Sequence, residues 1–351
     1  MFDLYSGNTP SRLNKKHFKG TVNWISSGEL KEHYIYSSKE QISEEAAKSL
    51  KLLPVGTFVI AIYGLEADGV RGTGSITQEP STISQACMSF IPKGVIENEF
   101  LYSWYKKHGN VIGIRYAQGT KQQNLSYDIL EGFKIAYPCT KEQKKLNKFI
   151  TFLDERIATQ NKIIDKLQTL IKGLRVRLVQ IEKGNIVHLN EIASIYQPQT
   201  ISSTELTEDG FWVYGANGII GKYKDYNHKT EQICITCRGN TCGMVNYTKP
   251  MSWITGNAMV INTDDYQDKV HKRYLYHYLS AYNFNSIISG SGQPQIVRTP
   301  LELLKVTLPT ILEQEQKAMF LDEIQGKIEI YNNILNLYLQ QKQYLLRQMF
   351  I

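Results

Sequence analysis

The sequence predicts an α+β fold in which two similar domains, each mixed α/β with an irregular β-sheet, are joined by two long antiparallel coiled-coil helices. Three observations predict this fold class. Short segments recur in the same order along the chain, several of them alternate apolar and polar residues, and a heptad pattern follows each copy. With 351 residues, the chain is long enough for two domains.

The repeat is clearest in one pair of segments. "AQGTKQQNLSYDILEGFKIAYPCTKEQ" (117–143) returns as "ISGSGQPQIVRTPLELLKVTLPTILEQ" (288–314), with the same Gly and amide cluster, Leu-x-x-x-Lys and Pro-x-x-x-Glu-Gln. Within the first copy, we expect "LSYDILEGFKIAYP" to be a strand-like return to the domain core. A second pair, "GTFVIAIYG" (56–64) and "EQICITCRG" (231–239), has the apolar alternation of a half-buried strand that ends in a turn. The shared order indicates two copies of one architecture.

A seven-residue apolar repeat follows Pro-x-x-x-Glu-Gln in both copies. One such amphipathic helix cannot bury its seam alone, so we expect the two helices to pair, antiparallel if a pseudo-two-fold axis relates the copies. About 30 to 35 helical residues at roughly 1.5 Å each give a spacer on the order of 50 Å. Gln160 and Lys342 interrupt the seam and are expected to fix its register, with snorkelling to solvent as the alternative for Lys342. The expected seam residues are Ile150, Leu153, Ile157, Ile164, Leu167, Ile171, Leu174, Leu178, Leu321, Ile324, Ile328, Leu335 and Leu345.

These patterns divide the chain into four parts. We expect a first domain at 1–140, a central spacer helix at 141–183, a second domain at 184–311 and a C-terminal spacer helix at 312–351. The second copy is reached through "NIVHLNEIASIY" (185–196), which we interpret as a short docking helix. The first copy starts at Met1 without a counterpart, so we expect its lead-in segment to be missing.

The formal net charge of +7 permits a polyanionic partner without requiring one. The positive excess is local, because residues 141–183 contain eleven Lys or Arg against five acidic residues, whereas 313–351 contain four against five. The basic face of the first helix could follow DNA between two half-sites, or could only solvate the helix and meet acidic patches on partner subunits. This face comprises Lys144, Lys145, Lys148, Lys166, Lys172, Arg175 and Arg177.

Hydropathy and cysteine usage favour a soluble, cytoplasmic protein. The sequence has no run of 18 apolar residues and no basic-then-apolar signal peptide at its start. Five cysteines, an odd number, argue against a disulfide framework. Cys234, Cys237 and Cys242 could be taken for a zinc site, but their strand-like context and the lack of further ligands at metal spacing favour structural cysteines. We expect neither a metal nor membrane association.

Catalytic motifs are missing from the sequence. There is no Gly-x-x-x-x-Gly-Lys-[Ser/Thr] phosphate loop, no Gly-x-Ser-x-Gly elbow and no His-Glu-x-x-His helix. Nor is there an Asn-Pro-Pro-Tyr or Asp-Pro-Pro-Tyr segment typical of amino-directed DNA methyltransferases. No two carboxylates stand out as a general acid and base. We therefore expect a non-catalytic chain without a cofactor of its own.

Loops rich in amides, Gly, Ser and Thr recur at matching places in both copies. They include "GTKQQN" (119–124), "SGSGQPQ" (289–295) and "CRGNT" (237–241). Gln and Asn can form bidentate hydrogen bonds to adenine, and Arg or Lys to guanine, in the major groove of DNA. Any one of these loops could be an ordinary polar turn, but their recurrence in both copies favours DNA contact.

Over nearly its whole length the chain resembles the specificity subunit of Type I restriction-modification systems. The resemblance rests on "WISSGEL" (24–30), "VYGANGIIGKY" (213–223), "GTKQQNLSYDIL" (119–130) and the Pro-x-x-x-Glu-Gln before each heptad helix. In that family each half is a target-recognition domain that reads one part of a split DNA sequence, and the antiparallel helices set the gap. The missing lead-in segment before Phe2 departs from the family pattern.

The resemblance also implies partners and cofactors. The partners are double-stranded DNA, two methyltransferase subunits that use S-adenosylmethionine to methylate adenine N6, and restriction subunits that use ATP and Mg for translocation and cleavage. This chain would recognise the DNA sequence at which those reactions take place, in a bacterial or archaeal cytoplasm.

Carried over by position, the recognition role falls on loops at Ser26–Glu29, Tyr63–Arg71, Lys121–Asn124, Tyr214–Asn217, Arg238–Thr241 and Gln293–Gln295. We expect Lys121 and Arg238 mainly to contact phosphate, and Gln123 and Gln295 to read bases. The individual candidates are Ser26, Ser27, Tyr63, Arg71, Lys121, Gln122, Gln123, Asn124, Tyr214, Asn217, Arg238, Asn240, Thr241, Gln293, Gln295 and Arg298.

Two other classes of function are alternatives to recognition of a DNA sequence. A two-headed coiled-coil scaffold would bind proteins only, and would show no salt-dependent binding to duplex DNA. A nuclease with dispersed carboxylates would cleave DNA by itself in the presence of a metal.

Overall fold

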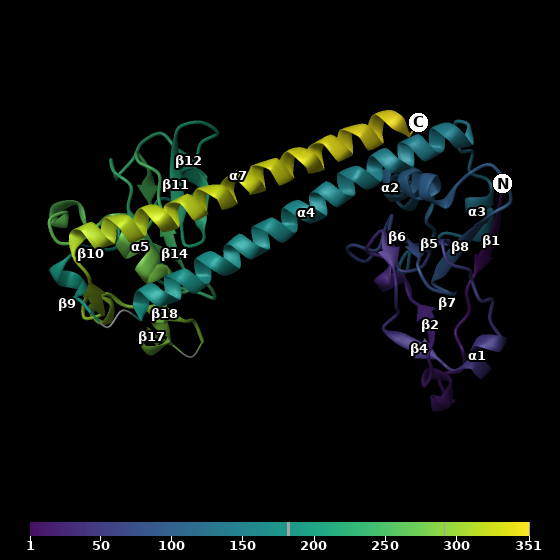
Figure 1. Ribbon diagram of the computed structural model, residues 1–351, viewed down its shortest axis with the longest axis horizontal. Helices are drawn as coiled ribbons and strands as arrows, with labels where there is room; N and C mark the ends of the chain where they lie inside the picture. Colours follow the sequence, from purple (N-terminus) through teal and green to yellow (C-terminus); the bar gives the residue numbers. More distant parts are fainter. Residues whose placement is uncertain (181–182, 291, 351) are drawn as a thin grey trace. The chain divides into compact units, whose positions relative to one another are not determined.

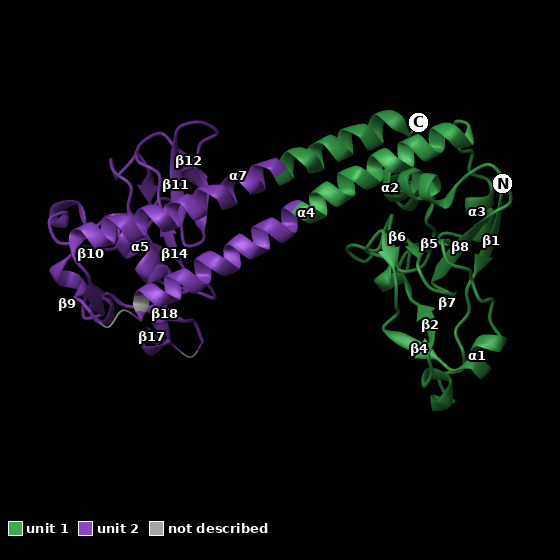
Figure 2. Cartoon of the chain, in the orientation of Figure 1, with its two compact units in different colours: residues 1–159, 335–351 green, residues 160–334 purple. Residues whose placement is uncertain are grey.

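A computed structural model of the protein describes residues 1–180, 183–290 and 292–350 (Figure 1). The chain divides into two compact units, with residues 1–159 and 335–351 in unit 1 and residues 160–334 in unit 2 (Figure 2). Two long helices, α4 (Thr140–Val179) and α7 (Ile311–Met349), each contribute one part to unit 1 and the other part to unit 2. The spacer helices were predicted at 141–183 and 312–351, of which residues 181–182 and 351 lie outside the described residues.

Unit 1 is built on a five-stranded and a three-stranded sheet, with strand orders β1-β8-β5-β6-β3 and β4-β2-β7. The 19-residue helix α2 (Asn98–Tyr116) packs on the larger sheet, where Phe58, Ile60 and Phe100 are almost fully buried. The strands are β1 (Phe2–Ser6), β2 (Val22–Ile25), β3 (Tyr34–Ile35), β4 (Glu40–Ile42), β5 (Phe58–Ala61), β6 (Gly74–Thr77), β7 (Ser81–Ile83) and β8 (Cys87–Pro92). Two short helices are α1 (Glu44–Lys48) and α3 (Tyr127–Glu131), and the 3-10 helices are η1 (Lys15–Phe18) and η2 (Ser27–Glu29).

Unit 2 repeats this plan with smaller sheets, in the orders β10-β16-β13-β14, β12-β11-β15, β17-β18 and β19-β9. Its helices are α5 (Lys272–Ala281) and α6 (Arg298–Glu302), with 3-10 helices η3 (Leu189–Glu191), η4 (Ser203–Glu205), η5 (Asp264–Tyr266) and η6 (Phe284–Ser286). The strands are β9 (Asn185–His188), β10 (Ser194–Tyr196), β11 (Phe211–Gly215), β12 (Gly218–Tyr223), β13 (Ile233–Thr236), β14 (Val245–Tyr247), β15 (Trp253–Ile254), β16 (Ala258–Asn262), β17 (Ile288–Ser289), β18 (Gln295–Ile296) and β19 (Lys305–Leu308).

The sequence repeat is a structural repeat. In unit 1, Leu4 of β1 pairs antiparallel with Phe90 of β8. In unit 2, Ile195 of β10 pairs antiparallel with Ile261 of β16, which lies 171 residues after Phe90. The next strand in each sheet, β5 or β13, is also antiparallel to β8 or β16. The predicted fold class, two similar mixed α/β domains with long paired helices, is confirmed.

The two long helices run antiparallel within each unit. In unit 1, Ile150 of α4 shares an apolar cluster with Phe350, just after α7, and one turn further along α4 the Asp154 carboxylate contacts the Lys342 ammonium. In unit 2, Ile171 and Leu178 of α4 share an apolar cluster with Ile328 and other residues of α7. Every predicted seam residue is buried or half-buried. The side chain of Lys342 does not simply extend into solvent. It pairs with Asp154 at the position where Lys342 interrupts the apolar seam.

The glutamine of Pro-x-x-x-Glu-Gln explains why this motif occurs twice. Gln143 is fully buried, and its Oε1 accepts the N–H of Glu97 at 3.0 Å while its Nε2 donates to the carbonyls of Val95 and Pro138. Gln314 makes the equivalent bonds to His271, Lys269 and Pro309. Each glutamine therefore ties the start of α4 or α7 to the start of α2 or α5, because it satisfies backbone groups that those helix ends leave unpaired.

Two predictions about local structure are wrong. Residues 185–196 do not form a docking helix but β9, η3 and β10, because Val187 extends along β19 while Leu189 and Ile192 turn into the core. In unit 1, "LSYDILEGFKIAYP" contains the helix α3 at its start, where Ser126 accepts the N–H of Ile129 as an N-cap. The rest of that segment, 132–138, pairs with no strand among the described residues.

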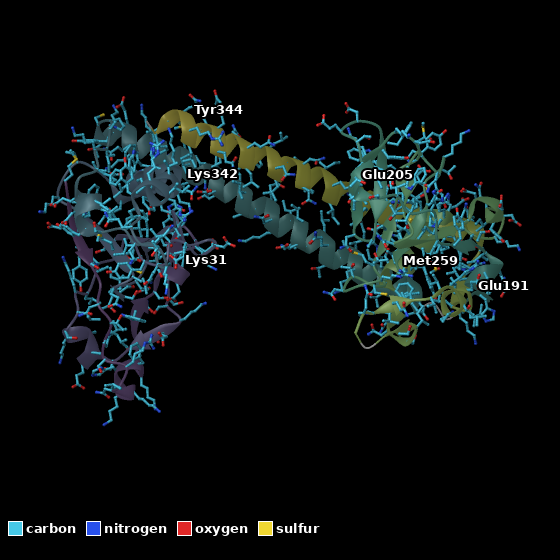
Figure 3. All side chains as sticks on the ribbon, turned by 180° about the vertical axis from the view of Figure 1, so that it is seen from behind. Lys31, Glu191, Glu205, Met259, Lys342 and Tyr344 are labelled. Atoms are coloured by element: carbon cyan, nitrogen blue, oxygen red, sulfur yellow. The ribbon has the colours of Figure 1, made fainter. Side chains whose placement is uncertain are left out.

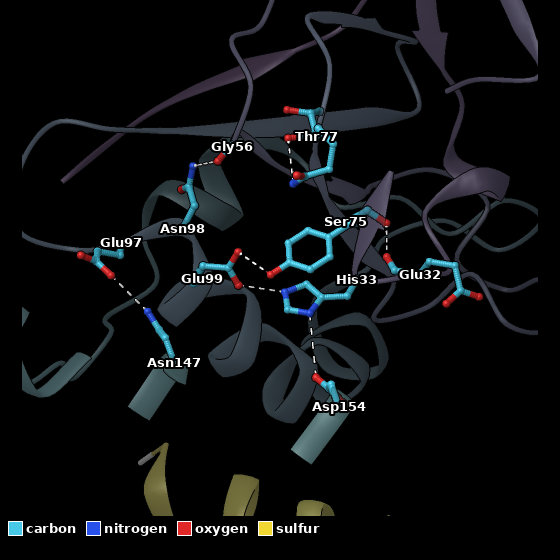
Figure 4. Close-up of polar contacts among 12 residues, drawn as sticks. Glu32, His33, Gly56, Ser75, Thr77, Glu97, Asn98, Glu99, Asn147 and Asp154 are labelled. Carbon is cyan, nitrogen blue, oxygen red and sulfur yellow. Dashed lines mark hydrogen bonds and ion pairs between the residues drawn. The ribbon is translucent and has the colours of Figure 1, made fainter. Parts of the chain in front are cut away.

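Half-buried polar groups attach the helices to the sheet region of unit 1 (Figure 4). His33 is stacked between Tyr34 and Tyr102, with ring centroids 4.0 and 3.9 Å apart. Its Nε2 lies 2.9 Å from Glu99 Oε2, and its Nδ1 lies 3.9 Å from Asp154 Oδ2. Because Asp154 also contacts Lys342, one carboxylate links α4 both to α7 and to the segment before β3.

Unit 2 has its own polar connection at the corresponding helices. The Nε of Arg175 donates to Nδ1 of His277 at 3.0 Å, so the other ring nitrogen carries the hydrogen and donates to Asp322 at 2.8 Å. Arg273 Nε lies 2.9 Å from both oxygens of Asp322. Arg175 was predicted to lie on a basic face that either follows DNA or solvates the helix, but its guanidinium bonds His277 of α5 and Gln325 of α7.

Candidate nucleic-acid interface

A tight turn in unit 1 brings two predicted loops together. Gly119 has φ 115°, and a Cβ at that residue would lie 2.0 Å from the carbonyl oxygen of Gln122. On either side of the turn, Gln118 and Asn124 exchange two backbone hydrogen bonds of 2.9 and 2.8 Å. The turn is therefore closed only with glycine at this residue. It holds Lys121 and Gln122 at its exposed tip.

Residues of the loop after β5 meet this turn. Tyr63 and Asn124 form an isolated antiparallel bridge, and the N–H of Leu125 donates to the carbonyl of Ile62 at 2.8 Å. Tyr63, Gln122 and Asn124 line an open hollow of about 490 Å³. Three of the predicted DNA-contacting residues are thus brought to one place.

Arg71, Gln123 and Glu66 hold the two loops to each other. Arg71 Nη2 donates to Gln123 Oε1 at 2.8 Å, and the N–H of Gln123 donates to Glu66 Oε2 at 2.7 Å. That backbone hydrogen bond lowers the pKa of Glu66. Arg71 is half-buried against Gly113 of α2, where a Cβ would lie 2.5 Å from Arg71 Cγ. Glu66 was missed in the sequence, although it lies inside the predicted loop.

The same junction recurs in unit 2. Gly290 has φ 93°, and a Cβ there would lie 2.4 Å from the carbonyl oxygen of Gln293. Arg238 and Gln295 form an isolated antiparallel bridge, and the N–H of Ile296 donates to the carbonyl of Cys237 at 3.0 Å. The side chains of Arg238, Gln293 and Gln295 are exposed.

A second pair of predicted loops meets in unit 2. The Thr241 hydroxyl contacts Oδ1 of Asn217, which lies in the turn between β11 and β12. The Thr236 hydroxyl similarly contacts the carbonyl of Ala216. Asn217 and Asn240 remain exposed beside this contact. The turns at 217 and 238–241 therefore form one surface with Gln295.

The two junctions share a backbone frame and differ in side chains. Asn124 and Gln295 are 171 residues apart, as are Gly119 and Gly290, so the equivalence extends from the turn to the bridge. At the other side of the bridge, Tyr63 in unit 1 is replaced by Arg238 in unit 2. The frame is kept while the groups available for base contact change.

Several predicted contact residues have structural roles instead. Tyr214 is only 6% exposed, and its hydroxyl accepts the N–H of Lys249 at 3.0 Å. A register shift between Val213 and Tyr214 turns this side chain inward, which the alternation in the sequence does not reveal. The Ser26 hydroxyl donates to Glu29 Oε2 at 2.6 Å as part of a cap of η2, which includes the half-buried Ser27. Arg298 is exposed but pairs with Glu302 one turn later in α6.

Sequence reasoning missed a basic cluster in unit 2. Lys222 Nζ and Lys249 Nζ lie 5.4 and 5.2 Å from the centroid of the half-buried Trp212 ring. A cation over an aromatic face is attracted to it. Lys222 also pairs with Asp209 at 3.5 Å, so Lys249 is the residue that presents positive charge beside Trp212. The recurrence of Trp at the start of "WISSGEL" and "WVYGANG" was the signal available in the sequence.

The described residues offer no group of three His, Cys, Asp or Glu placed to hold a metal ion. Cys234 and Cys237 are buried, and burial raises the pKa of the Cys234 thiol. Among the described helices, none combines the length and the apolarity needed to cross a membrane.

The fold and the site define a protein of two similar α/β domains, each of which presents a loop junction of the same frame. A model of the Type I restriction modification DNA specificity domain matches residues 1–169 and 182–337. The chain belongs to this family, and the resemblance inferred from its motifs is confirmed.

Individual relatives agree with the family. The chain is 24% identical over 349 residues to the Type I restriction enzyme EcoprrI specificity subunit of Escherichia coli. The alignment covers 92% of this chain and 85% of that protein. It is 29% identical over 174 residues to the Type I restriction enzyme MjaIX specificity subunit of Methanocaldococcus jannaschii. That alignment covers 47% of this chain and 39% of that protein.

Solved structures share the fold. The S subunit of a Type I restriction-modification system from M. genitalium matches 100% of this chain and 94% of its own, with a TM-score of 0.69 and 16% identity. A chain solved in a study of complex assembly and conformational transition of the type I R-M system matches 99% of this chain and 97% of its own, with a TM-score of 0.57 and 15% identity.

Family membership makes the chain a DNA target-recognition subunit of the type I class. The family specifies sequence and is not itself catalytic. None of these findings supports a scaffold that binds proteins without DNA.

Proposed function

We propose that each unit reads one half of a bipartite target in double-stranded DNA through its loop junction. The observation that carries this proposal is the shared frame with different side chains: Tyr63 and Asn124 in unit 1, Arg238 and Gln295 in unit 2. A conserved frame presents its side chains at one depth and direction, so a change of side chain changes the bases that can be bonded. Two half-sites of unlike sequence follow from two junctions of unlike chemistry.

The chemistry of the exposed tips fits DNA. Gln293 and Gln295 can each form paired hydrogen bonds to an adenine edge, whereas Lys121 and Arg238 supply the cations that neutralise phosphates. Lys249 adds positive charge on unit 2, whereas Lys222 is paired with Asp209 at 3.5 Å. In this proposal, Tyr214, Ser26 and Arg71 position the loops and do not read bases.

The helices that the units share would set the spacing of the half-sites. Helix α4 has 40 residues, which corresponds to about 60 Å of continuous helix. We also propose that the helices and units bind two methyltransferase subunits, and that restriction subunits join this complex. S-adenosylmethionine, ATP and Mg would then be held by the partner subunits, which would methylate adenine N6 and cleave DNA.

Mapping of N6-methyladenine across the host genome, with and without this gene, tests the proposal. Loss of methylation at one split motif is expected when the gene is deleted, and the motif gives both half-sites and their spacing. Expression of the Gln295→Ala variant in the deletion strain should relax one half of the motif only. Unchanged methylation in the deletion strain, with the partner subunits expressed, would contradict the proposal.

A binding experiment separates DNA recognition from a protein scaffold. The chain, purified with its methyltransferase subunits, should bind a duplex that carries the mapped motif more tightly than a scrambled duplex, with affinity that falls as salt rises. Equal affinity for both duplexes would contradict sequence reading. Metal-dependent cleavage by the chain alone would favour the nuclease alternative.

A further inference from the structure

Unit 2 contains an open cavity of about 430 Å³ where α4, α7 and the end of α5 meet. Its polar lining comprises Lys172 and Arg175 of α4, Gln325 of α7, and Ser280 and Tyr282 at the end of α5, together with a further glutamine of α4. Among the described residues, no carboxylate lines this cavity. All of the lining residues belong to unit 2. The cavity therefore presents two cations without a counter-charge in its own walls.

The guanidinium of Arg175 is held by neutral groups. Its Nε donates to His277 Nδ1 at 3.0 Å, its Nη2 donates to Gln325 Oε1 at 3.4 Å, and its Cζ lies 5.3 Å from the centroid of the Tyr276 ring. In the part of unit 2 that the structure describes, no ion pair includes Arg175 or Lys172. Because a half-buried charge is stabilised by an opposite charge, this arrangement favours an anion in the cavity.

Unit 1 has a carboxylate at the equivalent position. Gln325 lies 171 residues after Asp154, the same spacing as between the buried glutamines Gln143 and Gln314. In unit 1, Asp154 contacts the ammonium of Lys342, which is labelled on α7 in Figure 3. The helix pair of unit 1 thus neutralises its cation internally, whereas the helix pair of unit 2 has an amide in place of the carboxylate. This difference points to a negative charge that comes from outside the chain.

The two cations indicate the kind of anion. Lys172 and Arg175 are three residues apart in α4, so their side chains extend from the same face of the helix. The hydrogen bonds of Arg175 use Nε and Nη2, which leaves the N–H groups of Nη1 for a further acceptor. An ammonium beside a planar guanidinium matches the several oxygens and the double charge of a phosphate monoester better than it matches a single carboxylate.

The cavity has more room than a phosphate group requires. Ile171 and Ile328 are buried in its wall, and the half-buried Tyr282 offers an aromatic ring. The Ser280 hydroxyl donates to the carbonyl of Tyr276 at 2.7 Å, so its oxygen can accept a hydrogen bond from a ligand. Apolar walls with a few polar groups, in a volume of about 300–1,000 Å³, are typical of sites for small organic molecules.

From these observations we infer that the cavity of unit 2 binds a small phosphate monoester that carries a planar ring, the class to which nucleoside monophosphates belong. The phosphate lies between Lys172 and Arg175, where it provides the negative charge that Asp154 provides in unit 1. The ring packs against Tyr282 and Ile171. Because the ligand contacts α4, α7 and the end of α5 together, its binding stabilises unit 2. The inference stands independently of DNA reading.

Calorimetric titration of the full-length chain with adenosine monophosphate is the direct test. We expect saturable binding and a Tm that rises with the concentration of adenosine monophosphate. Inorganic phosphate and adenosine should each bind at least tenfold more weakly, because each lacks one half of the ligand. Absence of binding would overturn the inference. Equal binding of inorganic phosphate, or equal binding of adenosine, would also overturn it, since the first removes the ring from recognition and the second removes the phosphate.

Gln325→Glu tests the missing counter-charge without removing a contact. Glutamate keeps the length of the side chain and places a carboxylate beside the Arg175 guanidinium, as Asp154 does for Lys342. We expect Gln325→Glu to raise the Tm of the ligand-free chain and to weaken binding of adenosine monophosphate at least tenfold. Gln316→Glu, at an exposed residue of α7 outside the cavity, is the matched control and should change neither. Undiminished binding by the Gln325→Glu chain would contradict the inference.

Lys172→Gln removes the exposed cation of the site. It should weaken binding of adenosine monophosphate about tenfold and leave the Tm of the ligand-free chain unchanged, because Lys172 is exposed and has no described partner. Lys166→Gln, at an exposed residue of α4 that does not line the cavity, should leave binding unchanged. Equal effects of the two substitutions would show that Lys172 does not contact the phosphate.

Photolabelling and competition locate the bound nucleotide. A photoreactive azido derivative of adenosine monophosphate should label residues 168–176 or 280–282. Labelling of 238–241 or 292–295 instead would place the nucleotide on the candidate DNA-reading loops and would overturn the inference. A saturating amount of duplex DNA should not displace adenosine monophosphate. Displacement would assign Lys172 and Arg175 to the DNA backbone, which is a different function for these two cations.

Discussion

Arg238 and Gln295 face each other across an antiparallel bridge in unit 2, at the place where Tyr63 and Asn124 face each other in unit 1. The bridge fixes the direction of both side chains relative to the turn that Gly290 closes. Gln295 is exposed, and none of the described hydrogen bonds uses its side chain. It is therefore free to bond a base.

We predict that Gln295→Ala relaxes sequence choice at one half-site. The loss of a paired hydrogen bond to one base should reduce discrimination at that base pair by about 1–3 kcal/mol. Competition binding with duplexes mutated at single positions measures this. Gln316→Ala, at an exposed residue of α7, is the control. Equal weakening for every duplex would assign Gln295 to the backbone instead. Gln123→Ala should do more than relax one position, because Gln123 also holds Arg71.

Lys121→Ala should weaken binding to all duplexes alike. Lys121 is exposed at the tip of its turn, where its ammonium can reach a phosphate but has no fixed partner to aim it at a base edge. The slope of log K against log salt should flatten by about 0.9 for one lost phosphate contact. Titrations at several salt concentrations give the slope. Lys48→Ala, on the exposed end of α1, should leave it unchanged.

Gln143→Leu should destabilise unit 1, and Gln314→Leu should destabilise unit 2. Leucine has nearly the same size but leaves a backbone N–H and two carbonyls without their partner in a buried place. The expected loss is about 3 kcal/mol in each case. Hydrogen exchange resolves which unit opens, with Gln316→Leu as the exposed control. Gln143→Glu keeps the acceptor for the Glu97 N–H but loses both donors, so it should not restore stability.

These glutamines show what the sequence could and could not predict. The repeat, the heptads and the junction glycines are local patterns, and they predicted the fold class, the helices and the loops that meet. Two of the three partners of Gln143 lie 46 and 48 residues earlier in the chain, so no local pattern identifies them. Tyr214 was misplaced because a one-residue register shift reverses the face of a strand. The segment 185–196 was predicted as a helix because its apolar spacing fits a helix as well as a strand followed by a turn.

Acid should destabilise unit 2 in two steps. Burial lowers the pKa of His277 from its ordinary 6.5, against a hydrogen bond to Asp322 that raises it, and the nearby Arg175 lowers it further. Burial alone would raise the pKa of Asp322, but hydrogen bonds from His277 and Arg273 outweigh it and lower the pKa to about 2. In both groups the unfolded chain takes up the proton at a higher pH than the folded chain does. Stability is therefore lost as pH falls below about 6.5, and again as it falls from about 4 towards 2.

The second of these steps should cost about 1–2 kcal/mol, since Asp322 is partly exposed to solvent. Denaturant unfolding of the full chain from about pH 8 down to about pH 2, with hydrogen exchange to assign the unit, measures both steps. His277→Gln should remove the first step. Gln316→Ala, at an exposed residue of α7, is the control and should leave the pH profile of unit 2 unchanged. A profile without the first step in the parent chain would contradict the neutral state assigned to His277.

Gly290→Ala tests whether the closed turn positions Gln293 and Gln295, the candidate base-contacting residues of unit 2. A Cβ at Gly290 would lie 2.4 Å from the carbonyl oxygen of Gln293, and its φ of 93° disfavours any L side chain, so the turn must open. Gly292, two residues on in the same loop, has open space where a Cβ would be added. Gly292→Ala is therefore a control matched in residue type and loop. We expect Gly290→Ala to weaken binding to the specific duplex at least tenfold and to leave nonspecific binding within about twofold. The Tm should shift by only a few degrees, because the loop is exposed and contributes little to the core. Equal effects of the two substitutions on specific binding would show that the closed turn is not what presents Gln293 and Gln295 to DNA.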